Sequence, residues 1–116
     1  MSQVVRLVEA ERHELAPGVS MQPLFGEGAM LNLLEFEPRA TVPPHSHPHE
    51  QLGLVIEGVL VLEIDGAEHR LASGDAYQIP GGIEHAAWTQ EEGCRVLDVF
   101  QPVREDYLER ASRNER

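Results

Sequence analysis

The sequence predicts an all-β protein, folded as a small double-sheet jelly-roll barrel (a double-stranded β-helix), on two observations. Ten glycines and eight prolines are scattered among short apolar runs in a chain of 116 residues, which is typical of many strands joined by turns. One run also alternates, with Leu60, Leu62 and Ile64 on one face, and Asp65-Gly66 after it is a hairpin signal. About nine short segments of this kind predict two packed sheets closing into a barrel.

The elements are expected in a simple order along one domain, residues 1–116, with its core at about 28–102. A polar turn region is expected to follow the first strand and to reach Gly18. We expect strands at residues 4–9, 29–37, 58–65, 67–71 and 94–101, and a short charged helix or a fraying tail at 103–116.

Composition excludes several classes of partner. A net charge of -11 disfavours nucleic acid and anionic membranes, which such a surface would repel. No apolar run approaches the length of a membrane span and the N-terminus lacks a signal-peptide pattern. The single cysteine, Cys94, excludes an intrachain disulfide and fits a reducing compartment as a small buried residue. We therefore expect a cytoplasmic protein.

Two stretches carry the functional signal. The first, PHSHPHEQLGLVIEG at residues 44–58, places His45, His47 and Gln51 at even separations, so all three can point to one face of a strand. His49 shares this parity but follows Pro48, where regular pleating is least secure. The second, GDAYQIPGGIEH at residues 74–85, ends on another histidine. Imidazoles with one amide oxygen suit a divalent first-row metal and leave room for water or substrate.

The combined spacing, H-x-H-x3-Q-x6-G and then G-x5-P-x-G-x2-H, resembles the two motifs of the cupin superfamily. The resemblance implies a barrel with one divalent transition metal (Zn, Ni, Mn or Fe) inside, held by His45, His47, Gln51 and His85. Most cupins have Glu where this chain has Gln51, and many have Asn where it has Thr89. A neutral Gln ligand leaves the metal its full double charge, which makes it a stronger Lewis acid.

A third signal lies in the last strand. Asp98 interrupts the apolar run CRVLDVFQ, and burying an unpaired charge is costly. Alternation puts Asp98 and Phe100 on one face, and Arg104 follows just after Pro102. Asp98 is therefore either a functional acid or one half of a structural ion pair with Arg104.

Within the cupins, HSHPHEQ, the Gln ligand and the tail D-V-F-x3-R-E-D-Y-L are similar to KdgF-like proteins of pectin and alginate breakdown. The resemblance implies ring opening and ketonisation of 4,5-unsaturated monouronates, an isomerisation with no net redox change. It implies Asp98 as acid/base, Phe100 as a pocket residue and Arg104 as the anchor of an anionic substrate's carboxylate. Two alternatives stay open: a metal-dependent dioxygenase, and a non-catalytic sugar- or metal-binding module.

An oligomer is also expected. Leu52, Leu54 and Ile56 face opposite to Gln51, and an apolar outer face on a central strand needs to be covered. A homodimer is the simplest cover.

Overall fold

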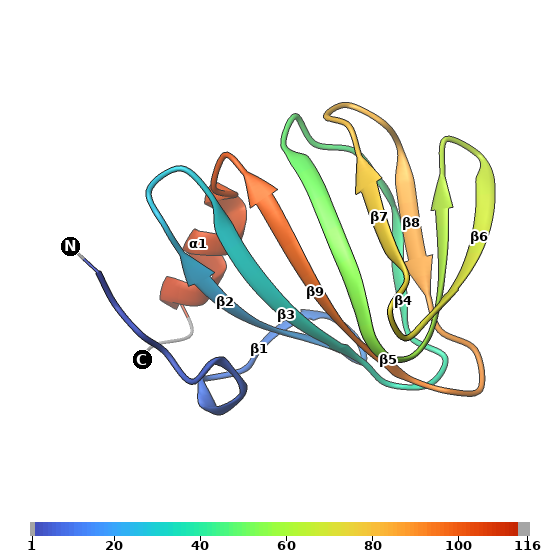
Figure 1. The fold of residues 1–116 in the computed structure, drawn as a ribbon, viewed down its shortest axis with the longest axis horizontal. Coiled ribbons are helices and arrows are strands. Elements are labelled where there is room, and N and C mark those ends of the chain that lie inside the picture. The colour runs from blue at the N-terminus through green and yellow to red at the C-terminus, as the bar shows by residue number, and fades with distance from the viewer. Residues whose placement is uncertain (1, 114–116) are drawn as a thin grey trace.

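The computed structural model describes residues 2–113. This part of the chain contains one 3-10 turn, nine strands and one helix: η1 (Leu7–Glu9), β1 (His13–Ala16), β2 (Val19–Phe25), β3 (Met30–Phe36), β4 (Thr41–His45), β5 (Glu50–Ile64), β6 (Ala67–Ala72), β7 (Ala76–Ile79), β8 (His85–Trp88), β9 (Cys94–Gln101) and α1 (Glu105–Arg113). In the sheet, hydrogen-bonded neighbours follow the order β1-β2-β3-β9-β5-β8-β4, and β6 and β7 also pair with β5. The predicted all-β barrel is thus confirmed (Figure 1).

The long strand β5 joins the two sides of the barrel. Its first half pairs with β7 and β9, and its second half pairs with β6 and β8. The halves meet at a bulge between Val55 and Glu57 and at Gly58, whose φ of 83° favours glycine. A Cβ at Gly58 would also lie 2.1 Å from the carbonyl oxygen of Gly93. The chain therefore needs glycine at this position.

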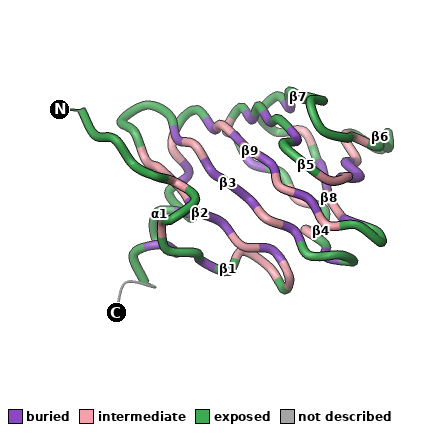
Figure 2. Tube along the Cα trace, turned by 60° about the horizontal axis from the view of Figure 1, so that its bottom comes forward, coloured by how far each residue is buried: buried purple, intermediate pink, exposed green. Residues whose placement is uncertain are grey.

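The core lies between the two sides of the barrel, where buried and less buried positions alternate along the strands (Figure 2). The most deeply buried apolar side chains come from four different strands: Val19, Met21, Val55, Leu60, Ile79, Val96 and Phe100. Cys94 is buried and free, as expected.

Two expectations for the N-terminal region were wrong. Residues 4–9 form no strand; Val4 is 100% exposed, and the Gln22 side-chain amide donates to the carbonyls of Val8 and Ala10. The turn region expected to reach Gly18 contains β1, and β2 begins directly after it at Val19. Pro23 weakens the strand signal of β2, but β1 pairs only up to Met21, so Pro23 lies where one side of β2 has no strand partner.

Within the C-terminal tail, Glu105–Arg113 form a helix rather than a fraying segment, and residues 114–116 lie outside the described part of the chain. Acidic residues occupy the first turn of α1 and basic residues the last, which complements the helix dipole. Tyr107 and Ala111, one turn apart, are buried against the barrel, and Arg110 donates to the carbonyls of Glu14 and Leu15. No helix in the described part of the chain is long and apolar enough to cross a bilayer.

Candidate functional site

The candidate site is a cluster of three histidines inside the barrel. His45 ends β4, His85 begins β8, and these two residues are ladder partners; His47 lies in the turn that leads to β5. One ring nitrogen of each histidine lies within 4.8 Å of the other two. Two segments about 40 residues apart, the two motifs of the sequence, are thus brought to one point by the pairing of β4 with β8.

The backbone sets the orientation of each imidazole. The Nδ1 atoms of His45, His47 and His85 lie 2.8, 3.2 and 2.9 Å from carbonyl oxygens of Pro43, His49 and Ile83. A carbonyl only accepts, so each Nδ1 carries the proton and each Nε2 has a lone pair; the Nε2 of His47 lies beside the Gln51 side chain. The Nε2 of His85 is buried without any hydrogen-bond partner. A buried ring nitrogen without a hydrogen-bond partner, close to two other histidine ring nitrogens, is the kind of ligand set that binds a metal cation.

The charge state of the histidines also fits a metal. Burial, assisted by the nearby Arg104 charge and by the neighbouring histidines, lowers the pKa of His47 from 6.5 to about 4. Burial likewise lowers the pKa of His85. Both rings are therefore neutral at pH 7, and a cation can bind without first displacing a proton from Nε2.

Gln51 on β5 connects this cluster to the buried acid. Its Oε1 lies 3.1 Å from Nε2 of His47, and its Nε2 donates to Oδ2 of Asp98 at 3.1 Å. The amide oxygen therefore faces the histidines and the amide nitrogen faces the carboxylate. A glutamate in this place would set a second carboxylate against Asp98, which gives a physical reason for the departure from the usual cupin ligand.

Asp98 on β9 is only 2% exposed and accepts a second hydrogen bond, 2.5 Å long, from the Tyr77 hydroxyl to its Oδ1. Burial raises its pKa to about 7, although the hydrogen bonds from Tyr77 and Gln51 and the charge of Arg104 oppose the rise. At neutral pH the carboxyl is thus poised between its two protonation states. No ion pair between Asp98 and Arg104 is recorded among residues 2–113.

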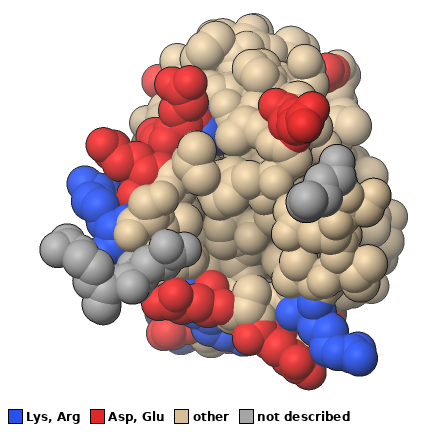
Figure 3. Space-filling model, turned by 90° about the vertical axis from the view of Figure 1, so that its left-hand side faces the viewer, with Lys and Arg blue, Asp and Glu red and all other residues tan. Residues whose placement is uncertain are grey.

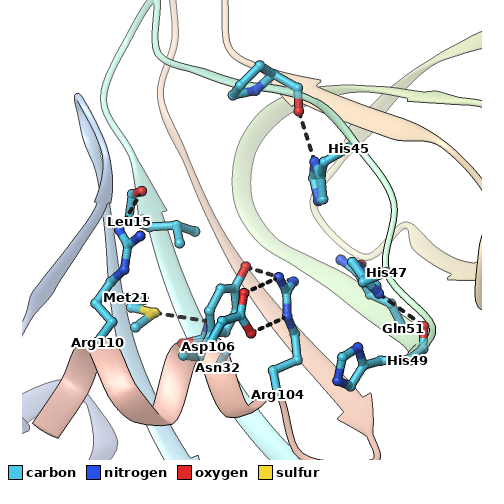
Figure 4. A network of polar contacts seen from close by, with 12 residues as sticks. Leu15, Met21, Asn32, His45, His47, His49, Gln51, Arg104, Asp106 and Arg110 are labelled. Carbon is cyan, nitrogen blue, oxygen red and sulfur yellow. Dashed lines mark hydrogen bonds and ion pairs between the residues drawn. The ribbon is translucent and has the colours of Figure 1, made fainter.

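Arg104, which directly precedes α1, pairs instead with a residue in the first turn of that helix. Its Nε and NH2 donate to the two oxygens of Asp106 at 3.2 and 2.8 Å, and NH1 donates to the Tyr107 hydroxyl at 2.9 Å. The guanidinium carbon lies 3.9 Å from the Tyr107 ring centre and 5.0 Å from that of Phe100. Figure 4 shows Arg104 between α1 and the histidines, with its fork toward Asp106. A guanidinium fixed in this way already holds one carboxylate.

Two spaces adjoin Arg104, one inside the barrel and one on its surface. The interior cavity has about 40 Å³ for solvent and is lined by His45, Gln51, His85, Asp98, Phe100 and Arg104 at its polar end. A larger depression of about 550 Å³ outside it is lined by residues 46–49 and 102–106. Arg104 lines both spaces.

All seven residues singled out from the sequence lie together: His45, His47, Gln51, His85, Asp98, Phe100 and Arg104. Phe100 is buried with its ring 5.6 Å from that of His47. The ring of His49 stays outside the histidine triad, while its carbonyl accepts from His47. Thr89 is not at the site; its hydroxyl binds the backbone of Glu37 and Ala40.

Sequence reasoning missed Tyr77, Asp106 and Tyr107 as members of the site. Tyr77 lies inside the second motif, two residues before the buried Ile79, so strand alternation could have placed it on the inner face. Asp106 and Tyr107 belong to the same R-E-D-Y-L run as Arg104, but their contact with it depends on the turn before α1.

Comparison with known proteins defines the class. Residues 32–100 match the family model described as Cupin domain, so the chain belongs to the cupin family. It is 30% identical over 102 residues to the pectin degradation protein KdgF of Dickeya dadantii, covering 86% of this chain and 93% of that protein. The structure of KdgF from Halomonas sp. superposes with a TM-score of 0.85 at 28% identity, over 92% of this chain and 99% of that one.

A third relative marks how far the similarity extends to other chemistry. The dimethylsulfoniopropionate lyase DddW of Ruegeria pomeroyi is 36% identical over 71 residues, which cover 61% of this chain and 47% of that protein. The resemblance to KdgF-like proteins stated from the motifs therefore extends over most of the chain, whereas the similarity to the lyase is partial.

Proposed function

We propose that this cupin is a metal-dependent isomerase that opens and ketonises 4,5-unsaturated monouronates. The observation that carries the proposal is the Gln51 side chain, whose oxygen faces the histidine cluster and whose nitrogen binds the buried carboxyl of Asp98. A candidate metal ligand and a candidate proton-transfer group are thus joined through one amide. The similarity to KdgF over most of both chains supports this choice of substrate.

In this proposal one divalent transition metal (Zn, Ni, Mn or Fe) is held by four ligands: His45, His47, Gln51 and His85. When bound, the metal supplies Lewis acidity toward a sugar or carbonyl oxygen. The residues that surround it bind the substrate, orient it and move protons.

Arg104 is the proposed anchor for the substrate carboxylate. Its guanidinium is buried and stacked on Tyr107, so it is held in place before substrate arrives. It also offsets the repulsion that a protein of net charge -11 exerts on an anion. Its hydrogen bonds to both oxygens of Asp106 are of the kind that it would donate to a substrate carboxylate.

Asp98 is the proposed proton-transfer group. In the substrate, C5 carries the carboxylate and the ring oxygen and is double-bonded to C4. Ring opening releases the proton of the C1 hydroxyl to solvent, breaks the bond from C1 to the ring oxygen so that C1 becomes an aldehyde, and leaves an enolate at C5. Asp98 then delivers a proton to C4 as the C5 oxygen becomes a ketone, so the proton gained balances the proton lost. A carboxyl with a pKa of about 7 can give and take a proton at neutral pH.

The test of the reaction follows the ultraviolet absorbance of an unsaturated monouronate, with an oxygen electrode in the same cell. Protein reconstituted with Zn, Ni, Mn or Fe is expected to abolish the ultraviolet absorbance of the substrate without oxygen uptake. NMR is expected to identify the product as the linear keto-uronate. Oxygen consumption would contradict the isomerase and support the alternative that the protein is a dioxygenase. A metal-loaded protein that turns over no substrate would favour the binding module.

The metal is tested separately, without any activity. Elemental analysis of protein purified without chelator is expected to find one divalent transition metal per chain. EDTA is expected to lower the melting temperature, since a ligand that binds only the folded state stabilises it by about 3 kcal/mol at a hundred times its Kd. Protein that holds no metal and gains no stability from any of the four ions would contradict this part of the proposal.

We also propose that two copies of the chain form a homodimer through the outer face of β5. Leu52, Leu54 and Ile56 are 46%, 41% and 39% exposed on adjacent outward positions, which is unusual for large apolar side chains of a central strand. Figure 3 shows a different side of the molecule, the left-hand side of Figure 1, where charged groups lie mostly around the edge and form no continuous basic surface. Light scattering at micromolar concentration is expected to give the mass of two chains, and the mass of one chain would contradict the dimer.

A further inference from the structure

Tyr77, Gly53 and Asp98 form a row across three neighbouring strands. Gly53 on β5 is the ladder partner of Tyr77 on β7 and also the ladder partner of Asp98 on β9. The Tyr77 hydroxyl nevertheless donates directly to Oδ1 of Asp98 at 2.5 Å. The tyrosine side chain therefore spans the central strand and binds a residue two strands away.

The missing side chain of Gly53 makes this contact possible. A Cβ built on Gly53 would lie 2.0 Å from Cζ of Tyr77 and 2.3 Å from its hydroxyl oxygen, distances that no packed structure tolerates. The backbone of Gly53 has no positive φ, so turn geometry does not call for glycine here. The space above Gly53 is required because the Tyr77 ring occupies it.

The hydrogen bond fixes the plane of the Asp98 carboxylate. Gln51 donates to Oδ2 and Tyr77 donates to Oδ1, so each oxygen has one fixed donor. With Gln51 alone, the carboxylate could rotate about its Cβ–Cγ bond, because terminal torsions of this kind are broad. Two donors on opposite oxygens leave one orientation, and proton transfer depends steeply on such alignment.

We propose that Tyr77 is a positioning residue for Asp98, and that glycine at position 53 leaves the space in which the Tyr77 ring reaches it. The catalytic part of this inference rests on the proposed function, because it takes Asp98 as the proton-transfer group. The geometric part does not: it states that the Tyr77 hydroxyl, reaching over Gly53, holds the Asp98 carboxylate in one orientation. Tyr77 contacts neither the histidines nor Arg104 by any hydrogen bond recorded for residues 2–113.

The first experiment compares Tyr77→Phe with wild type. The variant keeps the ring in the space above Gly53 and removes only the hydroxyl. We expect kcat to fall by about 10- to 100-fold, with KM, bound metal and melting temperature close to wild type. Unchanged kcat would overturn the positioning role. Loss of metal or a large fall in melting temperature would also overturn it, since the hydroxyl would then serve the fold.

A double-mutant cycle separates positioning from a general structural role. If Tyr77 acts only through Asp98, then adding Tyr77→Phe to Asp98→Asn should cause no further loss of kcat. Additive losses would show that Tyr77 acts through some other group, which would contradict the proposal.

A second cycle tests the opening at Gly53. Gly53→Ala is expected to lower kcat at least as far as Tyr77→Phe and to destabilise the protein as well. In a Tyr77→Ala background the added methyl group enters vacated space, so the stability cost of Gly53→Ala should disappear. A cost that persists in that background would show that another neighbour requires this glycine. Gly28→Ala is the matched control, because Gly28 has no atom within 4 Å of its ideal Cβ position and no positive φ.

Crystal structures of wild type, Tyr77→Phe and Gly53→Ala test the geometry even if the protein turns over no uronate. We expect the Asp98 carboxylate to rotate or to occupy two orientations in both variants. A carboxylate that keeps its wild-type orientation in both would overturn the inference. Absence of turnover in wild type, with the expected rotation in the variants, would instead overturn only the proposed reaction.

Discussion

The two ends of the barrel interior line one cavity, but one end buries polar side chains and the other buries apolar ones. The polar end holds the histidine cluster, with Gln51 and Asp98 beside it. The other end is lined by carbon, from Leu34, Phe36, Val42, Leu60, Leu62 and Ala87. Strand β5 contributes to both ends: Gln51, Gly53 and Val55 face inward before the bulge, and Leu60 and Leu62 face inward after it.

This difference separates stability from chemistry along a single strand. Burying apolar surface stabilises the fold, whereas each polar group at the other end loses water and regains only the hydrogen bonds that the site provides. The raised pKa of Asp98, caused first by burial, records this cost. Changes at the apolar end should therefore affect folding, and changes at the polar end should affect turnover and binding.

The largest expected effect is on turnover. Asp98→Asn keeps the shape of the side chain and removes the acid, so kcat on an unsaturated monouronate should fall by about 10²- to 10⁴-fold. Bound metal should stay close to wild type in elemental analysis. Normal turnover by this variant would exclude Asp98 from the reaction.

The opposite end should give the opposite result. Leu60 is almost fully buried, so Leu60→Ala is expected to reduce the free energy of unfolding by about 2–5 kcal/mol. Its kcat should remain within about twofold of wild type under conditions where it is folded, since no part of Leu60 belongs to the polar end. Leu108→Ala, at a half-exposed position on α1, is the control and should change stability little. A loss of kcat as large as that of Asp98→Asn would show that the two ends are not separable.

The pH dependence of stability should expose the cost of the buried acid. The folded-state pKa of Asp98 is raised from 3.8 to about 7, so between these values the native state holds a proton that the unfolded state has lost. Stability from this group therefore falls as pH rises from about 4 to 7. Asn cannot ionise, so the stability of Asp98→Asn relative to wild type should increase over this range, by on the order of 4 kcal/mol, and level off above pH 7.

This comparison is made by urea unfolding of chelator-treated protein. Any loss of hydrogen bonding caused by Asn is the same at every pH, and the contribution of His47 is common to both proteins, so only the slope is read. A difference that is constant from pH 4 to 8 would contradict a raised pKa for Asp98.

The smallest effects are expected at the mouth of the site, where Asp106 and the substrate carboxylate would compete for Arg104. Asp106→Asn should lower KM for the uronate by a few-fold, because it removes the charge that Arg104 now binds. Arg104→Ala should raise KM, by about tenfold or more, with a smaller effect on kcat. If Asp106→Asn raised KM instead, Asp106 would be needed to hold Arg104 in place for substrate.

Local patterns in the sequence determined much of this protein. Gly and Pro between short apolar runs predicted an all-β barrel. Two motifs indicated four candidate metal ligands, and the position of Asp98 in an apolar strand indicated a candidate functional acid. These predictions depend on side-chain periodicity and on residue chemistry, which are properties of neighbours in sequence. The exposed row of Leu52, Leu54 and Ile56 followed from the same alternation.

Only the tertiary structure decided how these parts meet. The bulge before Gly58 puts odd-numbered positions of β5 and, after it, even-numbered ones into the same cavity, which no single period reveals. The partner of Arg104 proved to be Asp106 rather than Asp98, because the turn into α1 sets the direction of the guanidinium. Tyr77 reaches Asp98 only because β5 places a glycine between them. Contacts across strands depend on register and on the space left by residues far away in the chain, and sequence spacing contains neither.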